Sequence, residues 1–293
     1  CNCRYALCGG NKLAVRLFEP PLAARPIMSL RIYAIAYLIF LYAPIVLLPL
    51  FAFNDGTIIA FPLSGFTTKW FTALTDTKAL HNAVQNSLFI AALTSVLSTI
   101  LGVCAARAGA MYNFPLKRGI IGLVMLPLVL PEIIVAVSLL VVVVQMLHMS
   151  LSNWTVIAAH VLICTPFSIA ILNGAFQNLD PSMEEAAMDL GESRWSAFRL
   201  VTLPLVMPGI ISSLLIAFTI SLDEFIIAFF LTGANPTMPV YIWGLLRFPG
   251  SLPIVMALGT ILVGLSIILL TIAEILRRRG MARAGVKDKG SFL

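Results

Sequence analysis

The sequence has 293 residues, of which 60% are hydrophobic and 11% are charged. Soluble domains carry about a quarter charged residues, so this composition excludes an ordinary soluble domain and predicts an all-α polytopic membrane protein. The net charge of +6 does not indicate nucleic-acid binding, because the basic residues lie beside apolar segments and form no basic and aromatic surface motif.

The first 30 residues contain no continuous apolar core, so they do not have the pattern of a cleavable signal peptide. We expect residues 1–30 to be a cytoplasmic tail that is either disordered or not native, since Met28 would be a natural start before the first span. Cys1 and Cys3 in this tail provide half of a zinc site without the other half. The sequence therefore predicts no metal and no cofactor.

A transmembrane helix needs about 20 mainly apolar residues. Six segments meet this requirement, and they define a transmembrane domain over residues 31–277, followed by a basic cytoplasmic tail at 278–293. The predicted spans cover residues 32–53, 84–106, 119–146, 154–176, 206–231 and 252–276. Prolines inside the first, third and fourth spans predict helices that are bent around an interior.

Basic residues fix the predicted orientation. With the amino end inside, 16 of the 19 Lys and Arg residues fall on the cytoplasmic side, and the remaining three are Lys69, Lys78 and Arg247. Cytoplasmic loops carry an excess of Lys and Arg. We therefore expect a multi-pass membrane protein with both termini in the cytoplasm.

Residues 180–208 form the one strongly charged internal segment, and we expect it to lie in the cytoplasm as two short helices. Asp180 or Ser182 can cap the first helix, and Gly191 supplies a left-handed stop. Ser193 can cap a second helix, for which Leu203 and Pro204 provide an end.

The same segment contains a spaced motif. Its residues are Glu185, Ala186, Ala187, Gly191, Val201, Leu203 and Pro204. The spacing resembles the EAA loop of the membrane subunits of type I ABC importers, where Ile is usual at the position of Val201. The surrounding sequence, with DLG, FRLVTLPL and the later SLDEF, is most similar to the second permease of spermidine/putrescine importers.

This resemblance implies a MetI-like permease fold of six transmembrane helices with a cytoplasmic coupling helix. It also implies a homologous permease subunit, two copies of an ABC ATPase subunit and an extracytoplasmic substrate-binding protein as partners. The residues expected to couple to the ATPase are Glu185, Ala186, Ala187, Gly191, Leu203 and Pro204. We expect Trp195 and Phe198 to anchor the second short helix against this chain itself.

No G-x-x-x-x-G-K-[ST] phosphate loop occurs in the sequence, so ATP hydrolysis would belong to a separate chain and this subunit would not be an enzyme. The three histidines, His81, His148 and His160, have no second ligand at helical spacing. We interpret His148 and His160 as hydrogen-bonded structural residues.

Three acidic residues within the spans, Glu132, Asp223 and Glu224, have no basic partner inside any span. An ionised group near the bilayer centre costs at least about 2.5 kcal/mol, so such groups usually face protein or water. Unpaired acids in an aqueous cavity attract cations, which predicts a substrate pathway for a cation. The alternative is that these acids are protonated and hydrogen-bonded to helix neighbours.

On straight helices, Glu132 and Asp223 would both lie about 21 Å from the cytoplasmic ends of their spans. Asp223 shares a helix side with Thr219, and we expect it to face the pathway. Glu224 would share a small-residue packing face with Ser213, Ala217, Ser221 and Ala228. The resembling family usually has two Asp residues where this chain has Asp223 and Glu224.

Tyr241 and Trp243 in the last external loop are candidates for an outer gate, because aromatic faces can hold an ammonium group. An interfacial aromatic belt is the alternative for them. The first external loop, residues 54–83, is interpreted as a solvated loop with Trp70 at the interface, although it could also face a docking protein.

These features together predict the permease subunit of an ATP-driven importer for putrescine and spermidine. Another small organic cation, an opine-like solute or a metal ion is the alternative cargo. A passive cation channel would also use intramembrane acids, but it would not need an EAA segment. An intramembrane enzyme is disfavoured, since the sequence contains no nucleophile and base constellation.

Overall fold

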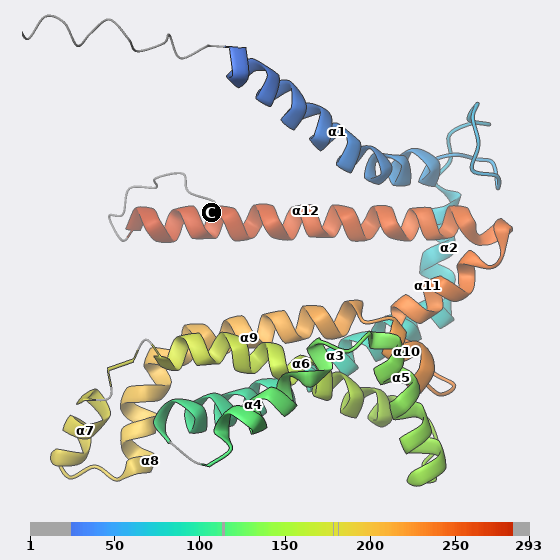
Figure 1. Ribbon diagram of the computed structural model, residues 1–293. Helices are drawn as coiled ribbons and strands as arrows, with labels where there is room; N and C mark the ends of the chain where they lie inside the picture. Colours follow the sequence, from blue (N-terminus) through green and yellow to red (C-terminus); the bar gives the residue numbers. More distant parts are fainter. Residues whose placement is uncertain (1–24, 113–114, 178, 181, 284–293) are drawn as a thin grey trace, which may run out of the picture.

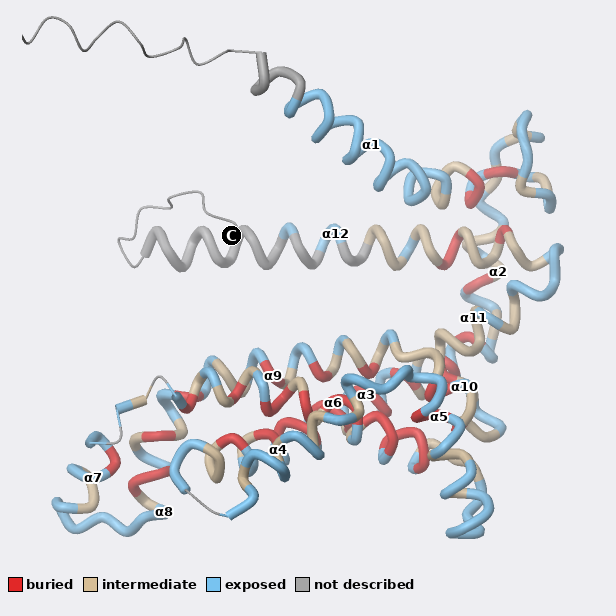
Figure 2. The backbone as a smooth tube through the Cα atoms, in the orientation of Figure 1, coloured by how far each residue is buried: buried red, intermediate tan, exposed pale blue. Residues whose placement is uncertain are grey.

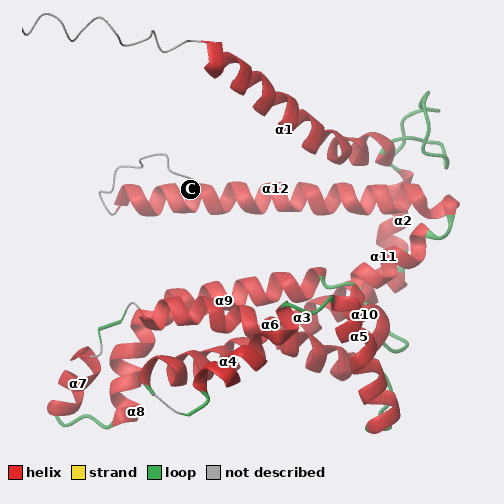
Figure 3. Cartoon of the chain, viewed as in Figure 1, coloured by secondary structure: helices red, strands yellow, loops and turns green. Residues whose placement is uncertain are grey.

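The computed structural model describes residues 25–112, 115–177, 179–180 and 182–283, which form helices joined by short connections (Figure 1). Within these ranges the only extended pairing is an antiparallel bridge between Asn54 and Phe66. Figure 3 shows the resulting helical architecture, so the predicted all-α class is confirmed. Residues 1–24 and 284–293, with the predicted zinc half-site, lie outside the described residues.

The helices fall into long and short elements. The long helices are α1 (Arg25–Ala52), α3 (Lys78–Met111), α6 (Asn153–Gln177), α9 (Leu203–Asp223) and α12 (Leu252–Arg283). The short α-helices are α2 (Lys69–Asp76), α4 (Lys117–Met125), α5 (Glu132–Val141), α7 (Ser182–Asp189), α8 (Arg194–Ala197), α10 (Ile226–Leu231) and α11 (Met238–Leu246). Single turns of other helix types are η1 (Leu126–Leu128), η2 (Val142–Met146), η3 (Phe198–Thr202) and η4 (Pro249–Ser251).

In the described part of the chain, four helical runs are long and apolar enough to cross a membrane, and a bent pair makes up to five. The runs contain α1, α3, α6 and α9, and the bent pair covers the predicted third span. Helix α12 extends over the whole predicted sixth span. The count of six spans stays a prediction.

The core of the bundle is formed by α3, α6 and α9, where buried residues concentrate (Figure 2). Helix α3 turns a face of mostly small residues inward. These include Ser87, Ala91, Thr94, Ser95, Ser98, Gly102 and Ala106. Because small side chains allow helix backbones to approach closely, α3 can pack tightly against α6 and α9.

Helices α1 and α12 pack against each other beside this bundle, and α2 and α11 connect them to it (Figure 1). Within the apolar stretch of α1, 6% of the residues are buried in the chain, compared with 61% for α6. So large an exposed apolar surface requires lipid or another apolar chain to cover it.

The predicted third span is broken. Helices α4 and η1 meet α5 and η2 at an angle of 99°. Pro131 lies at the break with an extended ψ of 129°, and a proline inside a helix removes a backbone hydrogen bond. The expected bend is confirmed here. The depth of Glu132 estimated along a straight helix is wrong, because the helix that Glu132 begins points in a new direction.

The predicted fifth span is also interrupted, so residues 206–231 are not one helix. Helix α9 ends at Asp223, Glu224 has an extended ψ of 116°, and α10 starts at Ile226. The Glu224 carboxylate accepts a hydrogen bond of 3.0 Å from the Ile227 amide and caps α10. The predicted helical stripe through Glu224 is therefore wrong, although Ser213, Ala217 and Ser221 do form a buried face of α9.

The loop after α1, which the sequence predicts to be external, is organised around Asn54, which is 1% exposed. Its Oδ1 accepts a hydrogen bond from the Ser64 amide at 2.9 Å, and its carbonyl accepts one from the Trp70 indole at 2.8 Å. Trp70 thus holds the loop in place. His160, inside α6, hydrogen-bonds through Nδ1 to Ser221 of α9 at 2.8 Å, which confirms its predicted structural role.

Candidate functional site

The segment between α6 and α9 folds into the two predicted short helices. Asp180 Oδ1 accepts a hydrogen bond from the Ser182 amide at 3.0 Å, at the start of α7. This bond lowers the pKa of the Asp180 carboxyl below its ordinary value, because it stabilises the charged form. At the start of α8, Ser193 Oγ accepts from the Ser196 amide at 3.2 Å. Both caps follow the sequence prediction.

Gly191 ends α7 as predicted. Its φ is +95°, a left-handed conformation that favours glycine. Its amide donates to the Met188 carbonyl at 2.9 Å, and the Glu192 amide donates to the Ala187 carbonyl at 3.2 Å. These bonds satisfy carbonyls that the end of a helix leaves free, and they fix the turn between α7 and α8.

The predicted end of the second short helix at Leu203 and Pro204 is wrong. Helix α8 continues through the π-turn η3 into α9, so that residues Arg194–Asp223 form one helical run. Pro204 occupies the first turn of α9, and the wide π-turn before it relaxes the requirement for the hydrogen bond that proline cannot donate. Leu203 and Pro204 therefore begin the membrane helix.

Four of the six residues expected to couple to the ATPase lie in α7 and the turn after it, whereas Leu203 and Pro204 belong to α9, where Leu203 packs against the core. Glu185, Ala186 and Gly191 are exposed, and Ala187 is half-buried. A surface that receives another protein must be accessible in the single chain, and these side chains meet that requirement.

A buried ion pair, which sequence reasoning missed, ties α7 to the bundle. Arg107 Nη2, near the end of α3, donates to Glu184 Oε1 at 2.8 Å. The other carboxylate oxygen of Glu184 accepts a hydrogen bond of 2.8 Å from Thr202 Oγ1 in η3. The Arg107 guanidinium carbon also lies 3.9 Å from the centre of the Phe198 ring. Four side chains from α3, α7 and η3 therefore meet at one point.

Trp195 and Phe198 do not share one role. Phe198 is 7% exposed and anchors the segment as predicted, whereas Trp195 is 70% exposed. The Trp195 ring lies against Phe198 with centroids 5.6 Å apart, and the rest of its surface is open. The expectation that Trp195 anchors the helix against this chain is wrong.

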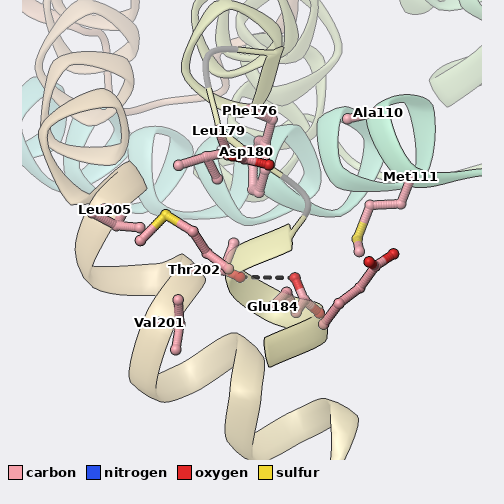
Figure 4. Close-up of a pocket in the computed structure, with 11 residues that line it drawn as sticks. Ala110, Met111, Phe176, Leu179, Asp180, Glu184, Val201, Thr202 and Leu205 are labelled. Carbon is pink, nitrogen blue, oxygen red and sulfur yellow. Dashed lines mark hydrogen bonds between the residues drawn. The ribbon is translucent and has the colours of Figure 1, made fainter. Parts of the chain in front are cut away.

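A cavity of about 260 Å³ lies beside the ion pair. Figure 4 shows Glu184 and Thr202 pointing toward each other at its edge, with Met111 at the end of α3 and Leu205 in α9 among its walls. The side chains around the ion pair thus fill only part of the space between α7 and the membrane helices.

The three acids that the sequence predicts for the substrate pathway lie at the two helix breaks. Glu132 is the first residue of α5, Asp223 is the last residue of α9, and Glu224 caps α10. Helices α5 and α10 pack together, so the helix that Glu132 begins and the helix that Glu224 caps are neighbours. Glu132 and Asp223 are exposed in the single chain, and Glu224 is half-buried.

The two aromatic residues proposed as an outer gate point to different places. The Trp243 ring lies 5.4 Å from the ring of Phe225, the residue that follows Glu224. Tyr241 instead packs in the cluster formed by α1, α2 and α12 around Ala257. Trp243 therefore contacts the chain neighbour of Glu224, and Tyr241 belongs to the packing between α2 and α12.

Known proteins match this arrangement in sequence and in fold. Residues 98–280 match the family described as "Binding-protein-dependent transport system inner membrane component". The spermidine/putrescine transport system permease protein PotC of Escherichia coli (strain K12) is 32% identical over 240 residues, which cover 82% of this chain and 90% of PotC. The putrescine transport system permease protein PotI of the same strain is 36% identical over 234 residues, covering 77% of this chain and 82% of PotI.

Among solved structures, a bacterial ABC transporter involved in the import of the acidic polysaccharide alginate contains a chain of similar fold. That chain aligns with a TM-score of 0.66 and 17% sequence identity, over 88% of this chain and 99% of its own length. The likeness supports the MetI-like permease fold expected from the EAA spacing. This chain belongs to the family of inner membrane components of binding-protein-dependent transport systems.

Proposed function

We propose that this chain is the permease subunit of an ATP-driven importer that moves putrescine and spermidine across a bacterial inner membrane. The observation that carries the proposal is the group formed by Glu132, Asp223 and Glu224 at the two helix breaks. In the described part of the chain, none of these carboxylates forms an ion pair. The relatives PotC and PotI, whose names specify polyamine transport, support this substrate class.

The chemistry of the group suits an organic polycation. Carboxylates attract ammonium groups over several ångströms, and a pathway that holds the cation weakly lets it move on. The Trp243 face beside Phe225 adds a surface on which an ammonium or methylene chain can rest. We infer that the cation passes Asp223 and Glu132 on its way inward, with Glu224 contributing charge while it caps α10.

Energy would come from a separate ATPase, coupled through α7. In this proposal the exposed face of α7, with Glu185, Ala186 and Ala187, docks on the ATPase, and Gly191 allows a close approach at the end of the helix. A homologous permease subunit, two ATPase copies and an extracytoplasmic binding protein complete the importer. Both termini lie in the cytoplasm, as the distribution of basic residues predicts.

The test is uptake of labelled putrescine and spermidine by uptake-deficient cells that express this chain with its neighbouring subunits. Wild type is compared with Asp223→Asn and with the matched control Asp76→Asn, which neutralises an exposed acid of α2. We expect ATP-dependent uptake in wild type and control, and at least about a tenfold loss in Asp223→Asn if one charged contact of about 1.5–3 kcal/mol is removed.

Other outcomes would overturn defined parts of the proposal. An assembled complex that takes up no polyamine would reject the substrate and favour another organic cation, an opine-like solute or a metal ion. Uptake that persists after ATP depletion would indicate a passive cation channel. Normal uptake by Asp223→Asn would reject the role of that carboxylate.

A further inference from the structure

One buried side chain of α7 links this helix to two other elements. All residues of α7 are described, and Glu184 is its only buried residue. Both carboxylate oxygens of Glu184 are used, one by Arg107 and one by Thr202, at 2.8 Å each. A cavity of about 260 Å³ lies beside it, and α7 also contacts α8 and η3. Glu184 is therefore the buried side chain that joins α7 to α3, in addition to the contacts of α7 with its neighbours along the chain.

The partners of Glu184 belong to two different transmembrane helices. Arg107 is on α3, the helix that packs along both α6 and α9. Thr202 and Phe198 are the two ends of η3, the π-turn that leads directly into α9. The guanidinium of Arg107 contacts both Glu184 and the Phe198 ring, so it holds α3 to both parts of the cytoplasmic segment.

The ion pair is shielded from solvent. The side chains of Arg107 and Glu184 are 22% and 10% exposed. Charged hydrogen bonds in such surroundings are short, directional and poorly screened by salt. Removal of one partner would leave the other charge buried without compensation. The arrangement is thus strong enough to act as a rigid connection, and it fails when either charge is removed.

We propose that the Arg107–Glu184 ion pair, held by Thr202 and Phe198, is the joint that makes α3 and α9 move with α7. Glu184 and Arg107 are positioning residues in this view, and the exposed residues of α7 make the contact with the ATPase. The inference rests on the proposed ATP-driven function, because it assigns the contacts within this chain that would pass the motion of α7 to the membrane helices.

The test measures the joint directly in the assembled complex. Spin labels are placed on the native Cys104 of α3, which is exposed, and on Asp189→Cys at the end of α7, with the other cysteines replaced by Ser. In wild type we expect one narrow α3–α7 distance distribution, both with and without ATP. Glu184→Gln keeps the size of the side chain but removes its charge, and we expect a broadened distribution that changes with nucleotide.

The second readout is the amount of solute transported per ATP hydrolysed in proteoliposomes. We expect Glu184→Gln to hydrolyse ATP but to transport at least about tenfold less per ATP, as for the loss of one charged hydrogen bond. Asp55→Asn is the control, since it breaks the exposed ion pair with Lys69 far from α7. It should match wild type in both measurements.

Thr202→Val covers the case in which Glu184→Gln does not assemble. It is close to isosteric and removes only the hydrogen bond to Glu184 Oε2, so we expect an intermediate broadening and an intermediate loss of coupling. Wild-type distances and transport per ATP in an assembled Glu184→Gln complex, or in Thr202→Val where that complex is lost, would overturn the proposal. If wild type transports no polyamine, the substrate assignment fails while the distance measurement still tests the joint.

Discussion

The close approach of α3 and α6 at Gly102 gives a prediction whose size follows from the coordinates. A β-carbon at Gly102 would lie 2.7 Å from Ser168 Cβ and 3.1 Å from the Ser168 carbonyl carbon. Carbon atoms pack at about 3.5–4.0 Å, so Gly102→Ala must separate the two helices by about 1 Å. Overpacking of this kind costs about 1–3 kcal/mol.

Gly109 supplies the matched control. It lies seven residues later on the same helix, about two turns away and on nearly the same face. A β-carbon there would have Asn173 Oδ1 at 3.8 Å as its nearest neighbour, an ordinary contact. Both substitutions gain about 0.8–1 kcal/mol of helix propensity, so the difference between the two variants isolates the packing cost of about 1–3 kcal/mol.

The assay is thermal unfolding of the purified protein in detergent, followed by intrinsic fluorescence. With about 2–4 °C per kcal/mol for a chain of this size, the apparent Tm of Gly102→Ala should lie about 2–12 °C below that of Gly109→Ala. Adding Ser168→Gly to Gly102→Ala moves the β-carbon from one helix to the other and removes the 2.7 Å contact, so it should recover part of the lost Tm. The Ser168 hydroxyl is buried without a hydrogen-bond partner, so this second change removes no bond. Equal Tm values for the two alanine variants would refute the reasoning.

Two further predictions concern the ends of α7. Gly191→Ala places a β-carbon in open space but at a φ of +95°, so it should cost about 1–2 kcal/mol of local stability. Faster amide exchange in α7 would show this cost, and unchanged exchange would contradict it. The Asp180 carboxyl has a lowered pKa, so its cap contributes above the ordinary aspartate pKa and is lost as the pH falls through the lowered value. The Ser182 amide of wild type should therefore lose protection from exchange between neutral and acidic pH, and Asp180→Asn should not show this loss. An identical pH response of the two proteins would contradict the prediction.

The helices and caps of the segment between α6 and α9 could be predicted because their signals act over a few residues. Asp180, Gly191 and Ser193 each satisfy backbone groups no more than four positions away. Local chemistry of this kind is visible in sequence. Pro204 was wrongly interpreted as the end of the second short helix. A proline can stop one helix or occupy the first turn of the next, and the residue type alone does not distinguish the two cases.

The joint at Glu184 could not be predicted in the same way. Arg107 and Glu184 are 77 positions apart, and each could be interpreted locally. Arg107 counted as one of the basic residues that predict the orientation in the membrane, and Glu184 counted as a charge on a solvated helix. Only the packing of α3 against the segment between α6 and α9 brings them together. A basic residue four positions before the end of a transmembrane helix is too common a feature to identify such a pair.

The break in the fifth predicted span was hidden for a different reason. Hydropathy averages over about 20 residues, so residues 206–231 meet the criterion for a span whether or not the helix is continuous. The interruption at Glu224 depends on a single carboxylate that caps the Ile227 amide. Two adjacent acids in an apolar run indicated the interruption, but they were interpreted as residues on different sides of one continuous helix.

The positions of the acids at the breaks distinguish their roles. Glu132 lies in the first turn of α5, and Glu224 caps α10, so both carboxylates lie at helix amino termini, where a negative charge is stabilised. Local structure thus explains why an apolar segment tolerates them. Asp223 is the last residue of α9, where the helix dipole disfavours a negative charge, and it accepts no described hydrogen bond in compensation. Asp223 therefore has the least local structural role of the three acids, so Asp223→Asn should leave the fold intact, and under the proposed function it should impair transport.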